Sequence, residues 1–132
     1  MIAPMPDTGG AEVIFNMVNN GGSKYSAVVR ERITIGRSFV VFDGREVLPM
    51  KSYKPMSVVT CNGVTHLVHG GYSTITEIWW SYRNGGDWVT DMKVPNQWSG
   101  AGPTLGCFDD TDAIMVHNVS GGTNLMWSIF GP

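Results

Sequence analysis

The residues best suited to ligand chemistry are a carboxylate and an indole ring in one apolar run, Glu77 and Trp79. Because side chains alternate between the two faces of a strand, this pair shares one face. A carboxylate or amide beside an aromatic ring suits sugar recognition, since polar atoms bond the hydroxyls while the ring stacks on the apolar sugar face. Asn124 and Met126 stand 47 positions later with the same spacing. Trp79 is instead a core residue if the sheet is packed on both faces.

Two histidines recur at the ends of apolar runs, His69 and His117, each followed by a turn. A polar side chain repeated at one edge of each unit could line shallow pockets, or it could pair with a neighbouring backbone carbonyl. Trp98 lies in a Gly/Ser-rich segment outside the strand pattern, where its ring is a candidate for stacking on a ligand or packing on another unit. The candidate ligand-binding residues are Glu77, Trp79, Trp98, His69, His117 and Asn124.

Catalytic chemistry finds little support in the residue pattern. Glycoside hydrolysis needs two carboxylates flanking the bond, or a tyrosine nucleophile with an acid. The acidic run 109–112 falls on a predicted tight turn, where solvation explains it. Sialidases also use a triad of arginines, but the arginines of this chain do not recur at regular positions. No Gly-x-Ser-x-Gly elbow marks a serine nucleophile. We therefore expect no enzyme activity and no catalytic residue.

Metal binding and a disulfide are not predicted either. The two cysteines and three histidines lack the Cys-x-x-Cys and His-x-x-x-His spacings of metal sites. Cys61 and Cys107 occupy non-equivalent places in the repeat, so the expectation is two half-buried thiols that pack as small apolar groups. No metal and no cofactor are expected.

Composition limits the class of protein. The chain has 132 residues, 17 of them glycine, and only 15% are charged, which favours many short strands joined by tight turns. A net charge of −2 gives no electrostatic footprint for nucleic acid, and the apolar runs are far shorter than a membrane span. Residues 1–10 carry no signal pattern. The expected location is the cytoplasm, or outside the cell by a route without a recognisable signal peptide.

Apolar runs between Gly, Asn and Pro punctuation predict strands throughout and no convincing helix. The predicted strands cover residues 12–18, 25–35, 38–42, 46–48, 56–60, 64–68, 75–82, 88–94, 104–108, 113–116 and 124–130. Asp43-Gly44 is predicted to be a hairpin turn, because both central positions of a type I′ turn need φ above zero. Residues 1–10 are predicted to be a flexible arm.

One strand sequence is repeated near the C-terminus. Residues 76–81, Thr-Glu-Ile-Trp-Trp-Ser, correspond to residues 123–128, Thr-Asn-Leu-Met-Trp-Ser. A repeat of this length marks one supersecondary unit, and such units stack because none buries its apolar faces alone. Trp80 and Trp127 share a repeat position and are therefore expected to be buried in equivalent cores. A single all-β domain is predicted over residues 11–132, with units at about 11–54, 55–102 and 103–132 and no fourth strand in the last.

The unit length and one turn resemble a known family. Four strands in about 40–50 residues is the signature of a β-propeller blade. Residues 81–88 resemble the Asp-box turn of sialidase-like propellers, Ser-x-Asp-x-Gly-x-x-Trp. Ser81, Gly85 and Trp88 match it, while Arg83 stands in place of the aspartate. Residues 98–128 also resemble the blades of bacterial and fungal sugar-binding propellers. That resemblance implies a structural role for Trp88 and a ring completed by several short chains.

The predicted fold is therefore all-β, with about three propeller-like, four-stranded antiparallel units and a ring completed by oligomerisation. A closed monomeric β-sandwich or barrel is the alternative. The predicted function is that of a non-enzymatic carbohydrate-binding protein, a lectin with repeated shallow sugar sites. A structural or assembly protein that binds other chains through open β faces comes second, and a sialidase-type glycosidase fragment comes third. Expected partners are glycans and further copies of the chain in a homo-oligomer, with no nucleic acid and no membrane insertion.

Overall fold

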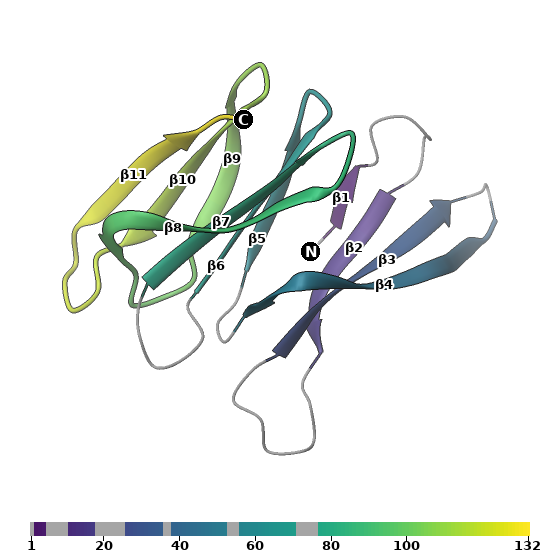
Figure 1. Cartoon of the computed structure of the whole chain (residues 1–132), viewed down its shortest axis with the longest axis horizontal. Coiled ribbons are helices and arrows are strands. Elements are labelled where there is room, and N and C mark those ends of the chain that lie inside the picture. The colour runs from purple at the N-terminus through teal and green to yellow at the C-terminus, as the bar shows by residue number, and fades with distance from the viewer. Residues whose placement is uncertain (1, 5–10, 18–25, 36–37, 53–55, 71–76) are drawn as a thin grey trace.

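The computed structural model describes residues 2–4, 11–17, 26–35, 38–52, 56–70 and 77–132, which form three antiparallel sheets (Figure 1). The first sheet contains β1 (Ile2–Pro4), β2 (Ala11–Met17), β3 (Ser26–Ile35) and β4 (Val40–Ser52). The central sheet contains β5 (Ser57–Cys61), β6 (Val64–Gly70), β7 (Glu77–Asn84) and β8 (Trp88–Trp98). The third sheet contains β9 (Thr104–Asp109), β10 (Asp112–Asn118) and β11 (Leu125–Phe130).

The all-β prediction is confirmed, and each sheet is a meander in which strands adjacent in sequence pair with one another. The sheets close into neither a barrel nor a propeller within the described part of the chain. Those residues also contain no helix long and apolar enough to cross a membrane.

The turn between β5 and β6 follows from the residues that form it. Cys61 pairs with Val64, which leaves Asn62 and Gly63 as a two-residue loop. Their φ angles are 42° and 86°, the positive values that a type I′ hairpin needs and that Asn and Gly tolerate best. This turn therefore fixes the register of the hairpin at the centre of the molecule.

The prediction of a hairpin turn at Asp43-Gly44 is wrong. β4 runs without interruption from Val40 to Ser52, and Gly44, with φ of 75°, is an extra residue opposite the Glu31–Arg32 step of β3. A glycine bulge and a type I′ turn both need positive φ, so the dipeptide alone does not distinguish them. The long pairing of β4 with β3 selects the bulge.

Part of the predicted N-terminal arm belongs to the first sheet. Ile2–Pro4 forms β1, whose residue Ile2 pairs with Val13 of β2. Residues 5–10 lie outside the described part of the chain. β2 pairs in turn with β3, so residues 11–17 belong to the sheet of the N-terminal unit.

The central sheet is packed on both faces, between the first and third sheets (Figure 1). β5 contacts both β1 and β9, so the first strands of the three sheets lie together. The core shared with the first sheet consists of Ile14, Val28, Leu48, Met50, Val58 and Leu67. The core shared with the third sheet consists of Val68, Ile78, Val94 and Met115, with Trp80, Leu105 and Phe130 packed against it.

The two repeated tryptophans are not buried alike, which corrects the prediction of equivalent cores. Trp80 packs against the second core, and its ring stacks on Phe130 with centroids 4.9 Å apart. Trp127 has 65% of its surface exposed. The difference arises because the third sheet covers Trp80, whereas none of the sheets formed by the described residues covers Trp127.

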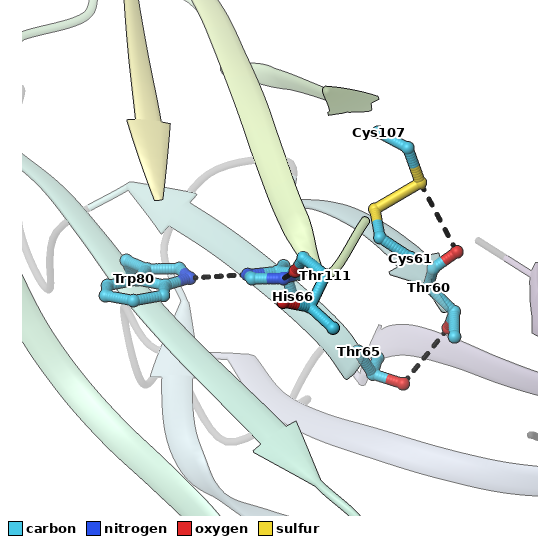
Figure 2. The surroundings of a disulfide bond; sticks show 7 residues. All are labelled: Thr60, Cys61, Thr65, His66, Trp80, Cys107 and Thr111. Atoms are coloured by element: carbon cyan, nitrogen blue, oxygen red, sulfur yellow. Dashed lines mark hydrogen bonds between the residues drawn. A yellow bond between two sulfur atoms is a disulfide. The ribbon is translucent and has the colours of Figure 1, made fainter. Parts of the chain in front are cut away.

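Cys61 and Cys107 form a disulfide, so the prediction of two free thiols is wrong (Figure 2). The bond joins β5 to β9, which belong to neighbouring sheets, across a Cα–Cα distance of 5.5 Å. The prediction assumed that a disulfide would join equivalent positions of two repeated units, and Cys61 and Cys107 are not equivalent in the repeat. A bond between units does not require equivalent positions, because the facing strands are offset from each other.

Candidate functional site

Two of the predicted ligand residues, Glu77 and Trp98, lie opposite each other where β7 pairs with β8. The Lys93 ammonium group donates a hydrogen bond to Glu77, and Trp79 lies opposite Lys93 in the next pair. Trp98 is 45% exposed and ends β8, so it belongs to a strand and not to the loop that the sequence predicted. This edge of the central sheet therefore presents an indole ring beside a carboxylate and an ammonium group.

The two predicted histidines are buried and hydrogen-bonded inside the protein. His69 has Nδ1 2.8 Å from the carbonyl oxygen of the next residue and Nε2 2.9 Å from a carboxylate oxygen of Asp91. His117 repeats this arrangement, with a carbonyl oxygen at 3.0 Å and Gln97 Oε1 at 2.9 Å. Both rings are almost completely buried, and each contacts the backbone carbonyl of the following residue, which is the second of the two predicted arrangements.

Asn124 is exposed in the turn that precedes β11. Its carbonyl oxygen accepts a hydrogen bond from Val119 N at 3.0 Å, which closes the turn. In the same turn, Ser120 N donates to the carbonyl oxygen of Trp98 at 3.0 Å. The segment that carries Asn124 is therefore held against the end of β8 at Trp98 and Ser99.

A second candidate site lies between the first and central sheets, where a groove of about 400 Å³ opens on the surface. It is lined by residues of β4 and β3 on one side and by the end of β7 and the β7–β8 turn on the other. The lining residues are Arg30, Glu46, Pro49, Arg83, Gly86, Asp87 and Trp88. Two guanidinium groups and two carboxylates line the groove, and Glu12 behind them adds a third carboxylate, so the groove favours a polar ligand without a large negative charge.

A chain of ion pairs holds the two walls of this groove together. Glu12 is fully buried and accepts from Arg83 at 2.7 Å and from Arg30 at 3.5 Å. The other terminal nitrogen of Arg30 lies 2.6 Å from Glu46 at the surface. A buried carboxylate needs such partners, because an unpaired charge is costly away from water. The network fixes both arginine side chains, which keep 14–18% of their surface exposed.

Arg83 and Trp88 connect the network to the turn between β7 and β8. The Arg83 guanidinium carbon lies 5.3 Å from the centre of the Trp88 ring, within the range of a cation–π contact. Trp88 also packs against the core between the first and central sheets, which agrees with a structural role for its ring. The sequence missed this groove, although one signal was present, namely an arginine at position 83 where the Asp-box pattern has an aspartate.

The groove offers donors, acceptors and one aromatic ring, the groups that bind sugar hydroxyls and apolar sugar faces. Within the described residues, no group of three or more His, Cys, Asp or Glu side chains could hold a metal ion. No protein-family model matches the chain, and neither a curated protein nor a solved structure matches it.

Proposed function

We propose that the protein is a non-enzymatic carbohydrate-binding protein and that the groove between the first and central sheets binds the sugar. The observation that carries this proposal is the set of paired, oppositely charged side chains around the Trp88 ring in a groove of about 400 Å³. Glu46 and Asp87 supply acceptors for sugar hydroxyls, while Arg30 and Arg83 supply donors. A neutral oligosaccharide fits these side chains better than a strongly anionic ligand does.

The proposal includes the edge formed by Glu77, Trp98 and Lys93 as a shallow extension of sugar contact. Trp98 has the exposed ring that stacking needs, and the side chains beside it carry both signs of charge. Single sites of this kind are weak, and several of them on one assembly gain strength through multivalency. The three sheets, with their first strands in contact, are consistent with three consecutive propeller blades in a ring that further copies complete.

A structural or assembly protein is the second candidate, because the third sheet exposes an apolar face around Trp127. A large exposed apolar patch marks an association surface in soluble proteins. This function does not exclude sugar binding, and the two make different predictions in a binding assay. A protein that only assembles retains no glycan at any concentration.

The test begins with a glycan array and continues with titration of a neutral oligosaccharide found there. Glu46→Gln and Asp87→Asn should each weaken binding about tenfold, the effect of losing a charge-assisted hydrogen bond. Both side chains are exposed, so the fold should tolerate the changes. Asp109→Asn is the matched control, because Asp109 is also exposed and does not line the groove.

Other outcomes would redirect the proposal. Binding that Trp98→Ala weakens and Asp87→Asn leaves unchanged would move the site to the edge of the central sheet. Turnover of a fluorogenic sialoside or another glycoside would favour the glycosidase. An array without any retained glycan would favour the assembly protein.

A further inference from the structure

The outer face of the third sheet is an apolar surface with no charged side chain among the residues that line it. A hollow of about 420 Å³ lies on this face. Leu125 is 68% exposed, Trp127 65% and Phe108 57%, values far above those of a packed sheet face. The lining includes Phe108, Ile114, Val116, Leu125, Trp127 and Ile129.

The equivalent face of the central sheet is covered within the chain, and it therefore indicates what could cover the outer face of the third sheet. In the central sheet Val68 pairs with Trp80, and in the third sheet Val116 pairs with Trp127 at the equivalent place. The neighbouring pairs also correspond, since His66 pairs with Tyr82 and Ile114 with Ile129. On the central sheet this face is covered by the inner face of the third sheet. The occupant that the repeat indicates is therefore another sheet of the same kind.

The opposite end of the stack supplies a second exposed apolar patch. Val47 and Phe42 of β4 are 65% and 59% exposed. They pair with Val29 and Ile33 of β3, so they lie on the face opposite Arg30, which lines the groove against the central sheet. Val29 and Ile33 are themselves buried, and the ion pair between Arg45 and Glu31 lies on the same face between Val47 and Phe42. Because the first and third sheets flank the central sheet, these two apolar patches lie at opposite ends of the stack (Figure 1).

We propose that the third sheet's outer face docks on the outer face of the first sheet in a second copy of the chain. Every chain carries both patches, so two copies can each offer one patch to the other and bury both. The covered face then reproduces the packing that the central and third sheets make within one chain. This inference rests on the blade-like stacking proposed above and is independent of glycan binding.

The experiment is light scattering with sedimentation on the full chain at micromolar concentration. The wild-type protein should have a mass at least twice that of the 14.4 kDa chain. Trp127→Arg and Val47→Arg should each weaken association by roughly 30-fold or more, as expected for a charge at the centre of an apolar interface. Mixing the two variants should restore part of the association, because one copy keeps an intact third sheet and the other keeps an intact first sheet.

Controls separate loss of association from loss of folding. Both substituted side chains are mostly exposed, so melting of the monomeric variants should remain cooperative. Val89→Arg places the same charge on an exposed apolar residue of β8 and should leave the mass unchanged. A monomeric wild type would overturn the proposal. So would association that Trp127→Arg abolishes and Val47→Arg does not affect, because that pattern means that two third sheets face each other.

Discussion

Between the first and central sheets the distinctive contacts are ion pairs around a buried carboxylate, whereas between the central and third sheets they are stacked rings, a disulfide and hydrogen bonds. In the first interface, Glu12 binds Arg30 and Arg83 beside an open groove. In the second, Trp80 stacks on Phe130 and the disulfide joins β5 to β9. A groove lined by fixed charged groups can bind a ligand, while the closed, cross-linked interface serves stability.

His66 shows how the second interface stays neutral (Figure 2). Its Nε2 lies 2.7 Å from the Thr111 carbonyl oxygen in the third sheet, and its Nδ1 accepts from Trp80 Nε1 at 3.3 Å. Only a ring that is protonated on Nε2 alone can make both bonds. Burial lowers the pKa of His66, against smaller opposing effects of the Thr111 carbonyl and of Asp112. The neutral ring is therefore part of the interface.

The largest expected effect is the loss of an aromatic ring from the second interface. Trp80→Ala should lower the free energy of unfolding by about 3–5 kcal/mol, because it removes a ring that packs against a core and stacks on Phe130. Trp127→Ala, at the equivalent position of the third sheet, should cost below about 1 kcal/mol in the dissociated chain. Urea unfolding at low protein concentration measures both. Equal losses would mean that Trp127 is buried in the single chain.

The next effect concerns the disulfide. Replacing both cysteines by alanine should cost about 2–4 kcal/mol, since the bond closes a loop between residues 46 positions apart. A reducing agent should lower the melting temperature of the wild type and leave that of the double variant unchanged. If reduction has no effect on the wild type, the bond does not stabilise this interface.

Breaking the ion pairs of the first interface should have a slightly smaller effect. Glu12→Gln should cost about 2–3 kcal/mol, below the range for a fully buried pair because both arginines keep some contact with water. Glu31→Gln is the control, since its partner Arg45 is 58% exposed and such pairs contribute about 0–1 kcal/mol. Thermal melting compares them. A Glu12 variant as stable as the control would mean that water molecules accept the hydrogen bonds of the two arginine side chains in place of the Glu12 carboxylate.

The smallest effect is a dependence on pH that belongs to the second interface. Since the folded-state pKa of His66 is below its ordinary value of 6.5, the unfolded chain binds a proton more readily. The stability that neutral His66 contributes is fully present above pH 6.5 and is lost as the pH falls below that value. The melting temperature should therefore fall more between pH 7.5 and pH 5.5 in the wild type than in His66→Gln. Parallel pH profiles would contradict the assignment.

The sequence by itself determined most of the strands, the tight turns and the internal repeat. These features depend on neighbours in the chain, such as the short run of buried residues in β6 and the positive φ angles of Asn62-Gly63. It also brought Glu77 and Trp79 to one face, because the period of a strand is local. Gly44 marks the limit, since a glycine with positive φ fits a turn and a bulge equally well until the partner strand is in place.

Only the tertiary structure decided how the sheets meet. The pairing of Cys61 with Cys107, the contact of Glu12 with Arg83 and the groove above it all join residues of different sheets. The exposure of Trp127 depends on whether another sheet lies against its face. Sequence periodicity specifies which face of a strand a residue occupies. Packing between segments far apart in the chain decides which sheet covers that face. The contacts at the two interfaces therefore differ, with ion pairs at one and stacked rings and a disulfide at the other, although the strands repeat.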